Sequence, residues 1–294
     1  MPRDGTADGV TVVVATRDRA ADLAATLPRH EAPVVVVDNG STDATVAVLR
    51  AEGRRRAGAG EPPLRHLRPG GNLGATARNE GARAATTEFV AFADDDSWWA
   101  PGALARAVAH LRAHPRVAVL AARTLVGPDE HLDPVCTDMA SAPWGRRPDL
   151  PGPDVLGFVA CAVVVRRDAF LGVGGFDDVV HFGGEEERVT YDLVADGWDL
   201  VYVDDVVAHH HPSPHRGDPA DRRLLLQRNA LLTAWMRRPL RVAAARTVRA
   251  LARGGEDRRG ALAALPRLRM ALRERRGTSR DLERRLRVLE LPRG

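Results

Sequence analysis

The sequence predicts an α/β fold with a mostly parallel central sheet, followed by a basic, mainly helical C-terminal extension. Two short runs rich in valine, 10–15 and 34–37, are bounded by polar turn residues, as strands buried on both faces of a parallel sheet are. Helical stretches separate such runs, so strand and helix alternate. Polar residues gather directly after the strands, which indicates a site at the carboxyl ends of the sheet.

The remaining elements can be placed in order along the chain. Ser41, Thr42 and Asp43 offer an N-cap for a helix that runs to about Glu52, and the Gly-, Arg- and Pro-rich residues 53–63 predict a surface loop. Residues 122–156 show no clear period and predict a long excursion on the substrate side. Further strands are predicted at 64–67, 89–92, 117–121, 158–165 and 200–203, and further helices from Gly74 to about Ala85, at 102–113 and at 185–195.

The charge of the chain is divided between an acidic body and a basic tail. From Ala220 onward there are 21 Arg against seven Asp and Glu, a net +14, whereas residues 1–219 carry −10. Two interpretations of the tail remain open: it docks on its own acidic body, or it contacts phosphates of nucleic acid, lipid headgroups or a lipid-linked substrate. Within the tail, amphipathic helical spacing places one set of apolar residues opposite a set of arginines: Leu240, Ala244, Val248 and Leu251 against Arg246, Arg249 and Arg253.

Cysteine usage and hydropathy bear on the compartment. The only cysteines, Cys136 and Cys161, have no metal-type spacing and exclude a disulfide framework, so a reduced cytoplasmic compartment is expected. No stretch approaches the about 20 apolar residues that span a bilayer. Any membrane contact is therefore expected to be peripheral, at the inner face and through the basic tail.

Three adjacent carboxylates, Asp94, Asp95 and Asp96, end the strand predicted at 89–92. Hard divalent cations such as Mg²⁺ and Mn²⁺ prefer carboxylate oxygens, and adjacent carboxylates repel one another unless a cation lies among them. The alternative is a solvated acidic turn before the helix at 102–113. Because strand ends meet at one edge of a parallel sheet, Thr16 and Asp38 are expected to face the same crevice as these carboxylates.

The ordered set of motifs resembles that of family 2 glycosyltransferases over about residues 10–215. No single motif is as specific as their order along the chain. The motifs are Thr16-Arg17, Asp38-Asn39-Gly40-Ser41, Asn72-Leu73-Gly74, Arg78-Asn79-Glu80-Gly81, Asp94-Asp95-Asp96, Gly174-Gly175-Phe176-Asp177, Gly184-Glu185-Glu186 and the run His209-His210-His211.

The resemblance implies a GT-A fold over 1–219 and an inverting transfer of a sugar from a nucleoside diphosphate to an acceptor hydroxyl. The helical extension predicted over 220–294 adds nothing to the resemblance. The acceptor would be a glycan, a lipid-linked molecule or a small molecule. A strand presents at most two of the three histidines to one side, and the resemblance places His210 in the liganding position. Asp96, Asp94 and His210 would then hold Mn²⁺ or Mg²⁺. The nucleotide would be bound by Thr16, Arg17, Asp38, Asn72, Arg78 and Asp94.

For several of these residues a structural role is the alternative. Asp38 suits an Asx-turn, the histidines suit a polar turn, and Arg78 suits a salt bridge within the acidic body. Trp98 and Trp99 fit packing better than sugar stacking. For Arg228 and Asn229, a solvated helix face competes with closure over the diphosphate.

Two positions depart from the family pattern. Glu186 stands where the family usually has Asp as the general base, and it is the first choice for that role, with Glu185 in reserve. Asp192 stands where the family often has Arg, which is expected to alter contacts with the diphosphate. The alternative for both glutamates is that they favour a helix N-terminus.

Rival functions have less support. A sugar-phosphate nucleotidyltransferase is expected to carry a glycine-rich basic loop after the first strand, and residues 15–19 contain no glycine. A non-catalytic nucleotide- or glycan-binding protein is favoured only by the departures at Glu186 and Asp192. Nucleic-acid binding is disfavoured, because no aromatic residues interleave the tail arginines from Arg237 onward.

Overall fold

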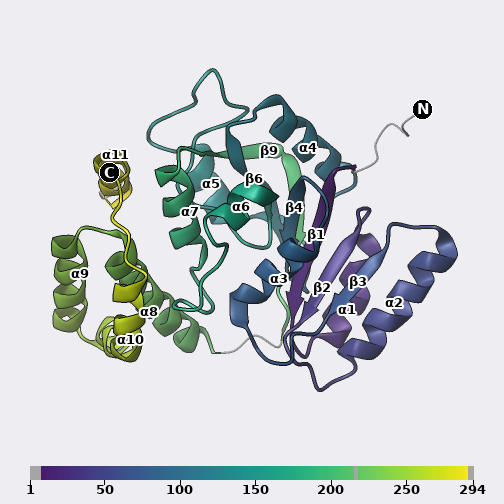
Figure 1. Cartoon of the computed structure of the whole chain (residues 1–294), viewed down its shortest axis with the longest axis horizontal. Helices are drawn as coiled ribbons and strands as arrows, with labels where there is room; N and C mark the ends of the chain where they lie inside the picture. The colour runs from purple at the N-terminus through teal and green to yellow at the C-terminus, as the bar shows by residue number, and fades with distance from the viewer. Residues whose placement is uncertain (1–7, 215–217, 291–294) are drawn as a thin grey trace.

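The computed structural model describes residues 8–214 and 218–290, and it combines one large sheet, helices on both of its faces and a helical C-terminal region (Figure 1). The strand order is β3-β2-β1-β4-β8-β6-β9-β5, with β7 paired to β6. The strands are β1 Val10–Thr16, β2 Val34–Asp38, β3 Leu64–Leu67, β4 Phe89–Ala93, β5 Ser97–Trp99, β6 Val117–Val126, β7 His131–Leu132, β8 Val163–Arg166 and β9 Asp199–His210.

The sheet is mostly parallel, as the sequence predicts. β1, β2, β3 and β4 pair in parallel, and β6 pairs in parallel with β9. β8 lies antiparallel between β4 and β6, so β6 runs in the same direction as β4. Six strands therefore share one direction: β1, β2, β3, β4, β6 and β9. Their carboxyl ends therefore meet at one edge, which is where the polar motifs follow the strands.

Helices cover both faces of the sheet. The helices of the body and extension are α1 Ala20–Thr26, α2 Thr45–Ala59, α3 Ala77–Ala84, α4 Ala103–Ala113, α5 Pro134–Ala140, α6 Arg167–Gly172, α7 Glu186–Ala195, α8 Pro219–Arg237, α9 Leu240–Arg253, α10 Gly255–Arg273 and α11 Arg280–Glu290, with short 3₁₀ turns η1 Leu27–Arg29 and η2 Gly74–Thr76.

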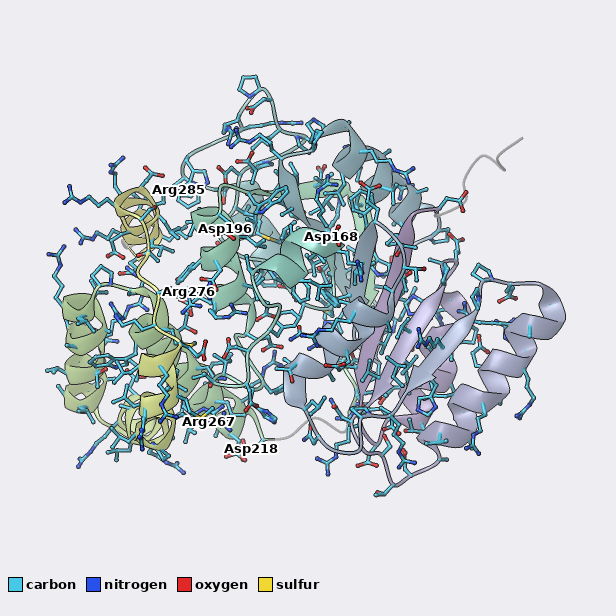
Figure 2. The ribbon with its side chains drawn as sticks, in the orientation of Figure 1. Asp168, Asp196, Asp218, Arg267, Arg276 and Arg285 are labelled. Carbon is cyan, nitrogen blue, oxygen red and sulfur yellow. The ribbon has the colours of Figure 1, made fainter. Side chains whose placement is uncertain are left out.

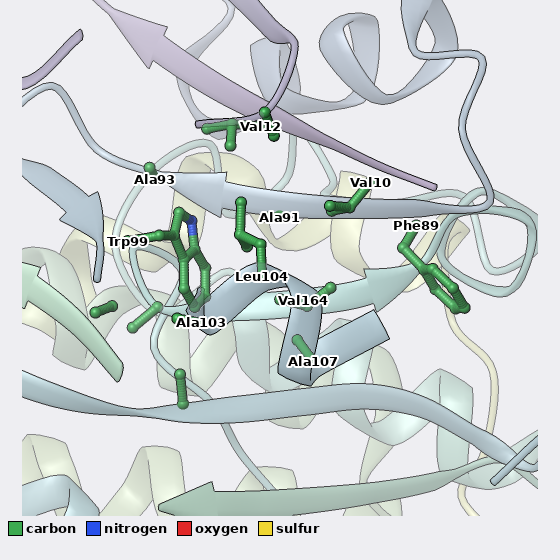
Figure 3. Close-up of a cluster of buried hydrophobic side chains, with 14 of the residues drawn as sticks. Val10, Val12, Phe89, Ala91, Ala93, Trp99, Ala103, Leu104, Ala107 and Val164 are labelled. Carbon is green, nitrogen blue, oxygen red and sulfur yellow. The ribbon is translucent and has the colours of Figure 1, made fainter. Parts of the chain in front are cut away.

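Alternate residues of the valine-rich strands pack into two separate cores. Val10, Val12 and Val14 lie in the core beneath α1 and α4, which Figure 3 shows with Trp99 and Leu104. Side chains from the opposite face, including Val13 and Val35, pack against α3, α6 and α7. The prediction of strands buried on both faces is therefore confirmed.

The predicted surface loop at 53–63 is wrong over residues 53–59, because α2 continues to Ala59, and only residues 60–63 form a loop. Arg56 anchors this part of the helix: its side chain is fully buried, bonded to Glu52, and donates to four backbone carbonyls, those of Leu27, His30, Ala32 and Pro62. Gly60, in the left-handed conformation, ends the helix. A helix therefore forms because tertiary hydrogen bonds outweigh the weak local propensity of its glycines.

The predicted excursion at 122–156 is only partly irregular. β6 extends to Val126, the short strand β7 pairs back onto it, and α5 follows with Asp133 as N-cap, whose side chain accepts from the Val135 N–H. The strand predicted at 158–165 is shorter, since β8 begins at Val163. The remaining residues before β8 include Cys161, whose carbonyl accepts from the Ser97 hydroxyl of β5 at 3.4 Å.

The C-terminal extension is helical, as predicted, and its four helices lie beside the body (Figure 1). None of the helices in the described part of the chain is long and apolar enough to cross a membrane. Several tail arginines dock on the body: Arg285 of α11 bonds Asp154 at 2.6 Å, and Arg267 of α10 donates to the Asp178 carbonyl at 2.6 Å. Figure 2 labels both arginines on the helices of the extension.

Candidate functional site

The ends of β1 and β2 bring Thr16 and Asp38 side by side. The two residues are register partners in the parallel pair. The Thr16 hydroxyl donates to a carboxylate oxygen of Asp95 at 3.0 Å, which links β1 to the acidic turn after β4. The predicted meeting of Thr16, Asp38 and the acidic run at one edge of the sheet is thus what the backbone produces.

Asp38 is fully buried, and its two carboxylate oxygens have different surroundings. One accepts from the Ser41 N–H at 2.7 Å, which is a contact of the turn alternative. The other lies 3.4 Å from Nε of Arg68 and 3.9 Å from Nε2 of His66. The pKa of His66 is lowered, mainly by burial. Asp38 therefore closes the turn with one oxygen and leaves the other among nitrogen atoms at the strand end.

The three carboxylates after β4 diverge instead of sharing one direction. Asp94 accepts from Arg78, Asp95 from Thr16, and Asp96 from the Ser213 N–H at 2.9 Å. Burial, reinforced by the charges of Asp94 and Asp96, raises the pKa of Asp95 to about 7. Asp96 is buried and Asp94 and Asp95 are partly buried, and all three carboxylates bind protein donors, so the alternative of a solvated acidic turn does not describe them.

The three histidines at the end of β9 alternate in direction, as expected for a strand. β9 pairs antiparallel with β5, and Nε2 of His210 lies 3.3 Å from a carboxylate oxygen of Asp96. His209 stacks on Trp98 with ring centroids 5.1 Å apart, and His211 meets the same indole edge-on at 4.6 Å. Only His210 therefore faces the acidic turn.

A thiol lies among the candidate metal ligands. One ligand atom each from Asp94, His210 and Cys161 lie within 4.8 Å of one another, and Asp96 contacts His210. Carboxylates and an imidazole at such separations fit a divalent cation. No sequence pattern indicates Cys161 as a ligand, because it lies in the loop before β8, far along the chain from the acidic run.

Arg78 connects this cluster to the carboxylate pair. It lies on α3, is almost fully buried, and donates to Asp94 and to Glu185, the latter at 3.4 Å. The salt-bridge alternative therefore describes its contacts within the chain. Glu185 is consequently engaged by a guanidinium, which leaves its neighbour Glu186 as the carboxylate without an arginine bond in this group.

Glu186 begins α7 and approaches the cluster from the opposite side. One of its oxygens accepts from the Ala160 N–H at 3.2 Å, next to Cys161. Burial, together with the charge of Glu185, raises the pKa of Glu186 to about 8. A carboxylate in such surroundings has a strong tendency to take up a proton, which is the property a general base needs.

The loop before this carboxylate pair is held from both sides. On one side the Ala75 N–H donates to the His181 carbonyl at 2.7 Å, and the approach is so close that a Cβ at Gly74 would lie 2.4 Å from the same oxygen. On the other side the amide of Asn229 in α8 donates to the carbonyls of Phe182 and Gly183, at 2.7 and 2.6 Å. Asn229 is fully buried. We refer to residues 180–184 as the carboxylate loop.

Two roles were predicted for Arg228 and Asn229: closure over a diphosphate, or a solvated helix face. Their contacts match neither role. Arg228 donates to Asn229 and to the Val180 carbonyl at 3.0 Å. Both residues therefore bind the backbone of the carboxylate loop. The sequence places Arg228 and Asn229 on one helix, but it does not indicate which backbone carbonyls they bind.

Asp192 has a structural role, and the expected change in diphosphate contacts is not supported by its position. It is buried on α7, bonded to Arg188 at 2.5 Å and to Arg237 of α8. Its carboxylate therefore neutralises two buried guanidinium groups between the body and the extension.

The remaining candidates lie at the rim of the site or in the core. Arg17 is exposed and pairs with Asp18 at 3.6 Å. Asn72 is exposed, and its side chain accepts from the Gly74 N–H, which places it on the loop that contacts His181. Trp98 and Trp99 are both buried, Trp98 under Arg29, so packing describes them and sugar stacking does not.

Comparison with known proteins agrees with this arrangement. The model of the glycosyl transferase family 2 matches residues 11–173. A pre-mycofactocin glycosyltransferase of Mycobacterium tuberculosis is 34% identical over 209 residues, 69% of this chain and 43% of the relative, so the chain spans less than half of that protein. An N-acetylglucosaminyl-diphospho-decaprenol L-rhamnosyltransferase of the same species is 28% identical over 250 residues, 71% of this chain and 78% of the relative.

Solved structures share the fold. The mannosyltransferase PcManGT of Pyrobaculum calidifontis, in complex with GDP-Man and Mn²⁺, has a TM-score of 0.60 at 23% identity and covers 90% of this chain and 74% of its own. TarS of S. aureus, in complex with UDP-GlcNAc, has a TM-score of 0.56 at 17% identity, covering 76% and 66%. The sheet is thus of the GT-A type, and the chain belongs to glycosyltransferase family 2.

Proposed function

We propose that the protein is an inverting glycosyltransferase that transfers a sugar, of the hexosyl class, from a nucleoside diphosphate to an acceptor hydroxyl. The observation that carries this proposal is the convergence of a candidate metal cluster with the pair Glu185-Glu186. Arg78 bonds Asp94 of the cluster and Glu185 of the pair, and Glu186, whose pKa is raised, is the neighbour of Glu185. The two relatives from Mycobacterium tuberculosis are named as sugar transferases, and two proteins with a similar fold bind GDP-Man and UDP-GlcNAc.

The nucleotide would lie at the carboxyl ends of β1 and β2. The second oxygen of Asp38 is suited to accept from a base N–H or a ribose hydroxyl, and Thr16 holds the adjacent strand end to Asp95. Arg17 and Asn72, both exposed at the rim, would complete the donor site. Arg78 would turn from Asp94 toward the diphosphate, because phosphate oxygens match the same planar donor pattern.

Asp96, Asp94 and His210 would hold Mn²⁺ or Mg²⁺, since two carboxylates and an imidazole fit such a cation, and the Cys161 thiol lies beside them. When bound, the cation supplies charge neutralisation for the departing diphosphate. The protein contributes the geometry: Ser213 fixes one oxygen of Asp96, and the pairing of β5 with β9 directs His210 toward the other.

Glu186 would act as the base in a single displacement. As the acceptor oxygen forms its bond to the anomeric carbon, its proton passes to the Glu186 carboxylate, and the bond between that carbon and the diphosphate oxygen breaks with inversion. Glu185 would orient the site through Arg78, since its carboxylate is already bound there. This division of roles suits a base whose pKa lies near the working pH.

The proposed roles of the two parts of the chain rest on the contacts between α8 and the carboxylate loop. Residues 1–219 would form the catalytic GT-A domain and 220–294 the extension that supports the carboxylate loop through α8. A non-catalytic binding protein remains the rival function, and its only support is the unusual Glu186.

Thermal unfolding with GDP, UDP and dTDP, each with and without Mn²⁺, tests the donor site, because a ligand of the native state raises the melting temperature. The expected result is a cation-dependent rise for one nucleotide. Slow cation-dependent hydrolysis of the matching nucleotide sugar then separates the enzyme from a binding protein. If no nucleotide shifts the melting temperature in either condition, the proposal is wrong.

A further inference from the structure

Helix α9 presents its large apolar side chains to solvent and its small ones to the protein. Ala243 and Ala250 are buried, whereas Val248 is 66% exposed and Leu251 42% exposed. An amphipathic helix that packs on its own domain normally buries the larger side chains. The apolar stripe predicted from the sequence therefore faces away from the body, and the helix packs through alanines.

The beginning of α10 continues this pattern across the turn at Gly254. Its buried residues are again small, Gly260, Ala261 and Ala264, while Leu262 is 49% and Leu265 56% exposed. Ala250 and Ala261 pack together with Leu231, so the two helices meet through small residues near this turn. We call the exposed apolar residues Val248, Leu251, Leu262 and Leu265, with the exposed arginines Arg249, Arg258 and Arg259, the α9–α10 corner.

The arginines of the extension divide into two sets. Arg237, Arg238, Arg267 and Arg285 bind carboxylates or carbonyls of the protein. Within the described ranges, no ion pair is recorded for the arginines of the α9–α10 corner, and α9 contains no acidic residue. The acidic residues at the start of α10 are engaged elsewhere, Glu256 with Arg223 and Asp257 with Gln227 and Arg253. The corner is consequently apolar and positively charged.

We propose that the α9–α10 corner is a docking surface for an anionic lipid bilayer. Guanidinium groups beside exposed leucine and valine match the two layers of such a surface, phosphate headgroups above acyl chains. The charge complementarity selects this occupant: the corner has arginines at its rim and no free carboxylate among its described residues to repel a headgroup. The arginines that bind the protein would dock the tail on the body, and those of the α9–α10 corner would contact lipid phosphates. Both interpretations of the tail that the sequence left open would then apply, each to a different set of arginines.

If the proposed function holds, docking would place the enzyme at a membrane surface, where an acceptor on a lipid carrier is accessible. The docking itself does not depend on catalysis, because binding to vesicles is measured without any sugar donor. Donor-induced thermal shifts, measured in parallel, report on the nucleotide site alone, so failure of one proposal is distinguishable from failure of the other.

Co-sedimentation with vesicles of phosphatidylcholine, with and without phosphatidylglycerol, tests the surface. The expected result is binding only to the anionic vesicles, reduced by salt. Arg249→Gln with Arg258→Gln should weaken this binding by at least about tenfold, because each arginine near an anionic surface contributes appreciably. Val248→Gln with Leu251→Gln should also weaken it, through lost apolar insertion.

The matched control is Arg50→Gln with Arg54→Gln on α2, which removes two exposed arginines at the opposite end of the molecule (Figure 1). It should leave vesicle binding unchanged, and the melting temperatures of all variants should match that of the parent protein, since every substituted side chain is exposed. Equal losses in the α2 control and the corner variants would reduce the effect to net charge and overturn the proposal. So would absence of binding to anionic vesicles, or self-association through the corner on size-exclusion chromatography.

Discussion

Arg237 of α8 donates two hydrogen bonds to the carboxylate of Asp192 on α7, and both side chains are buried. Asp192 also binds Arg188 of its own helix at 2.5 Å, so one carboxylate serves two guanidinium groups. The extension is thereby joined to the helix whose first residue is Glu186. The pairing also gives Asp192 a structural role, in place of an effect on the diphosphate.

The first prediction concerns this pair. Asp192→Asn removes the carboxylate that Arg237 binds and leaves Arg188 with Asp177 alone, so it should lower the free energy of unfolding by about 3–5 kcal/mol. Chemical denaturation of the variant measures the loss. Asp196→Asn, an exposed residue at the end of the same helix (Figure 2), is the control and should change stability little. A loss below about 1 kcal/mol at Asp192 would show that the pair does not anchor the extension.

The second prediction concerns the candidate base. Glu186→Gln should lower turnover about 10²–10⁴-fold while nucleotide affinity stays near that of the parent protein. Glu185→Gln should be milder in turnover. If Glu185→Gln is inactive and Glu186→Gln is not, the two roles are exchanged; if both variants remain active, the pair is not the base.

The raised pKa of Glu186 also predicts a pH dependence. A base must be deprotonated, so turnover should rise with pH toward about 8 and level off above it. The effect on stability has the opposite sign. Because the pKa is about 8 in the folded protein and 4.5 in an ordinary Glu, the folded state holds the proton more tightly than the unfolded state. The resulting stabilisation is complete below pH 4.5 and is lost as the pH rises through 8. Unfolding measured from pH 6 to 9 should show a flatter profile for Glu186→Gln.

The third prediction concerns the clamp on the carboxylate loop. Asn229→Asp keeps the size of the side chain but removes both amide protons that hold the carbonyls of Phe182 and Gly183. Turnover should fall by about tenfold or more from misplacement of Glu186, with cation-dependent nucleotide binding unchanged. Arg223→Gln, which breaks an exposed pair with Glu256 on the same helix, is the control. Equal loss of nucleotide binding and turnover in Asn229→Asp would indicate general disruption instead.

The fourth prediction concerns the metal cluster. Asp96→Asn removes the charge that holds a divalent cation and should abolish the Mn²⁺-dependent part of nucleotide binding. Isothermal titration with Mn²⁺ present and absent measures that part directly. Undiminished cation dependence in this variant would remove Asp96 from the metal site.

The fifth prediction uses the thiol in the same cluster. Titration with Co²⁺ should produce a sulfur-to-metal charge-transfer absorption, because Cys161 offers its Sγ beside ligand atoms of Asp94 and His210. Cys161→Ser should abolish the band. Cys136→Ser should keep it, since that thiol is buried elsewhere, against Thr124. A band that survives in Cys161→Ser would place the thiol outside the coordination sphere.

The sequence predicted the parallel sheet and its site edge because both depend on local signals. The valine period marks the strands, and polar residues after Thr16, Asp38 and Ala93 mark their ends. The family resemblance selected His210, and the alternation of a strand accounts for the opposite direction of His209 and His211, which pack on Trp98.

What the sequence could not reveal are contacts between distant segments. The length of α2 depends on carbonyls that bind Arg56, the clamp depends on carbonyls that meet Asn229, and Cys161 joins the acidic turn only through the fold. Backbone carbonyls carry no sequence signature, because every residue has one. The burial of Asp192 likewise depends on Arg237, which lies on a different helix.

The chain has no lysine, and Arg56 shows why its arginines are not interchangeable with that residue. Its guanidinium reaches four carbonyls and Glu52 at once, whereas an ammonium group has only three hydrogens on a single nitrogen. Lysine can therefore be introduced at exposed arginines such as Arg54 but not at this position. Because native side chains carry no amine, a lysine introduced at Arg54 would be the only side-chain target of an amine-reactive dye, with the α-amino group as the one other amine.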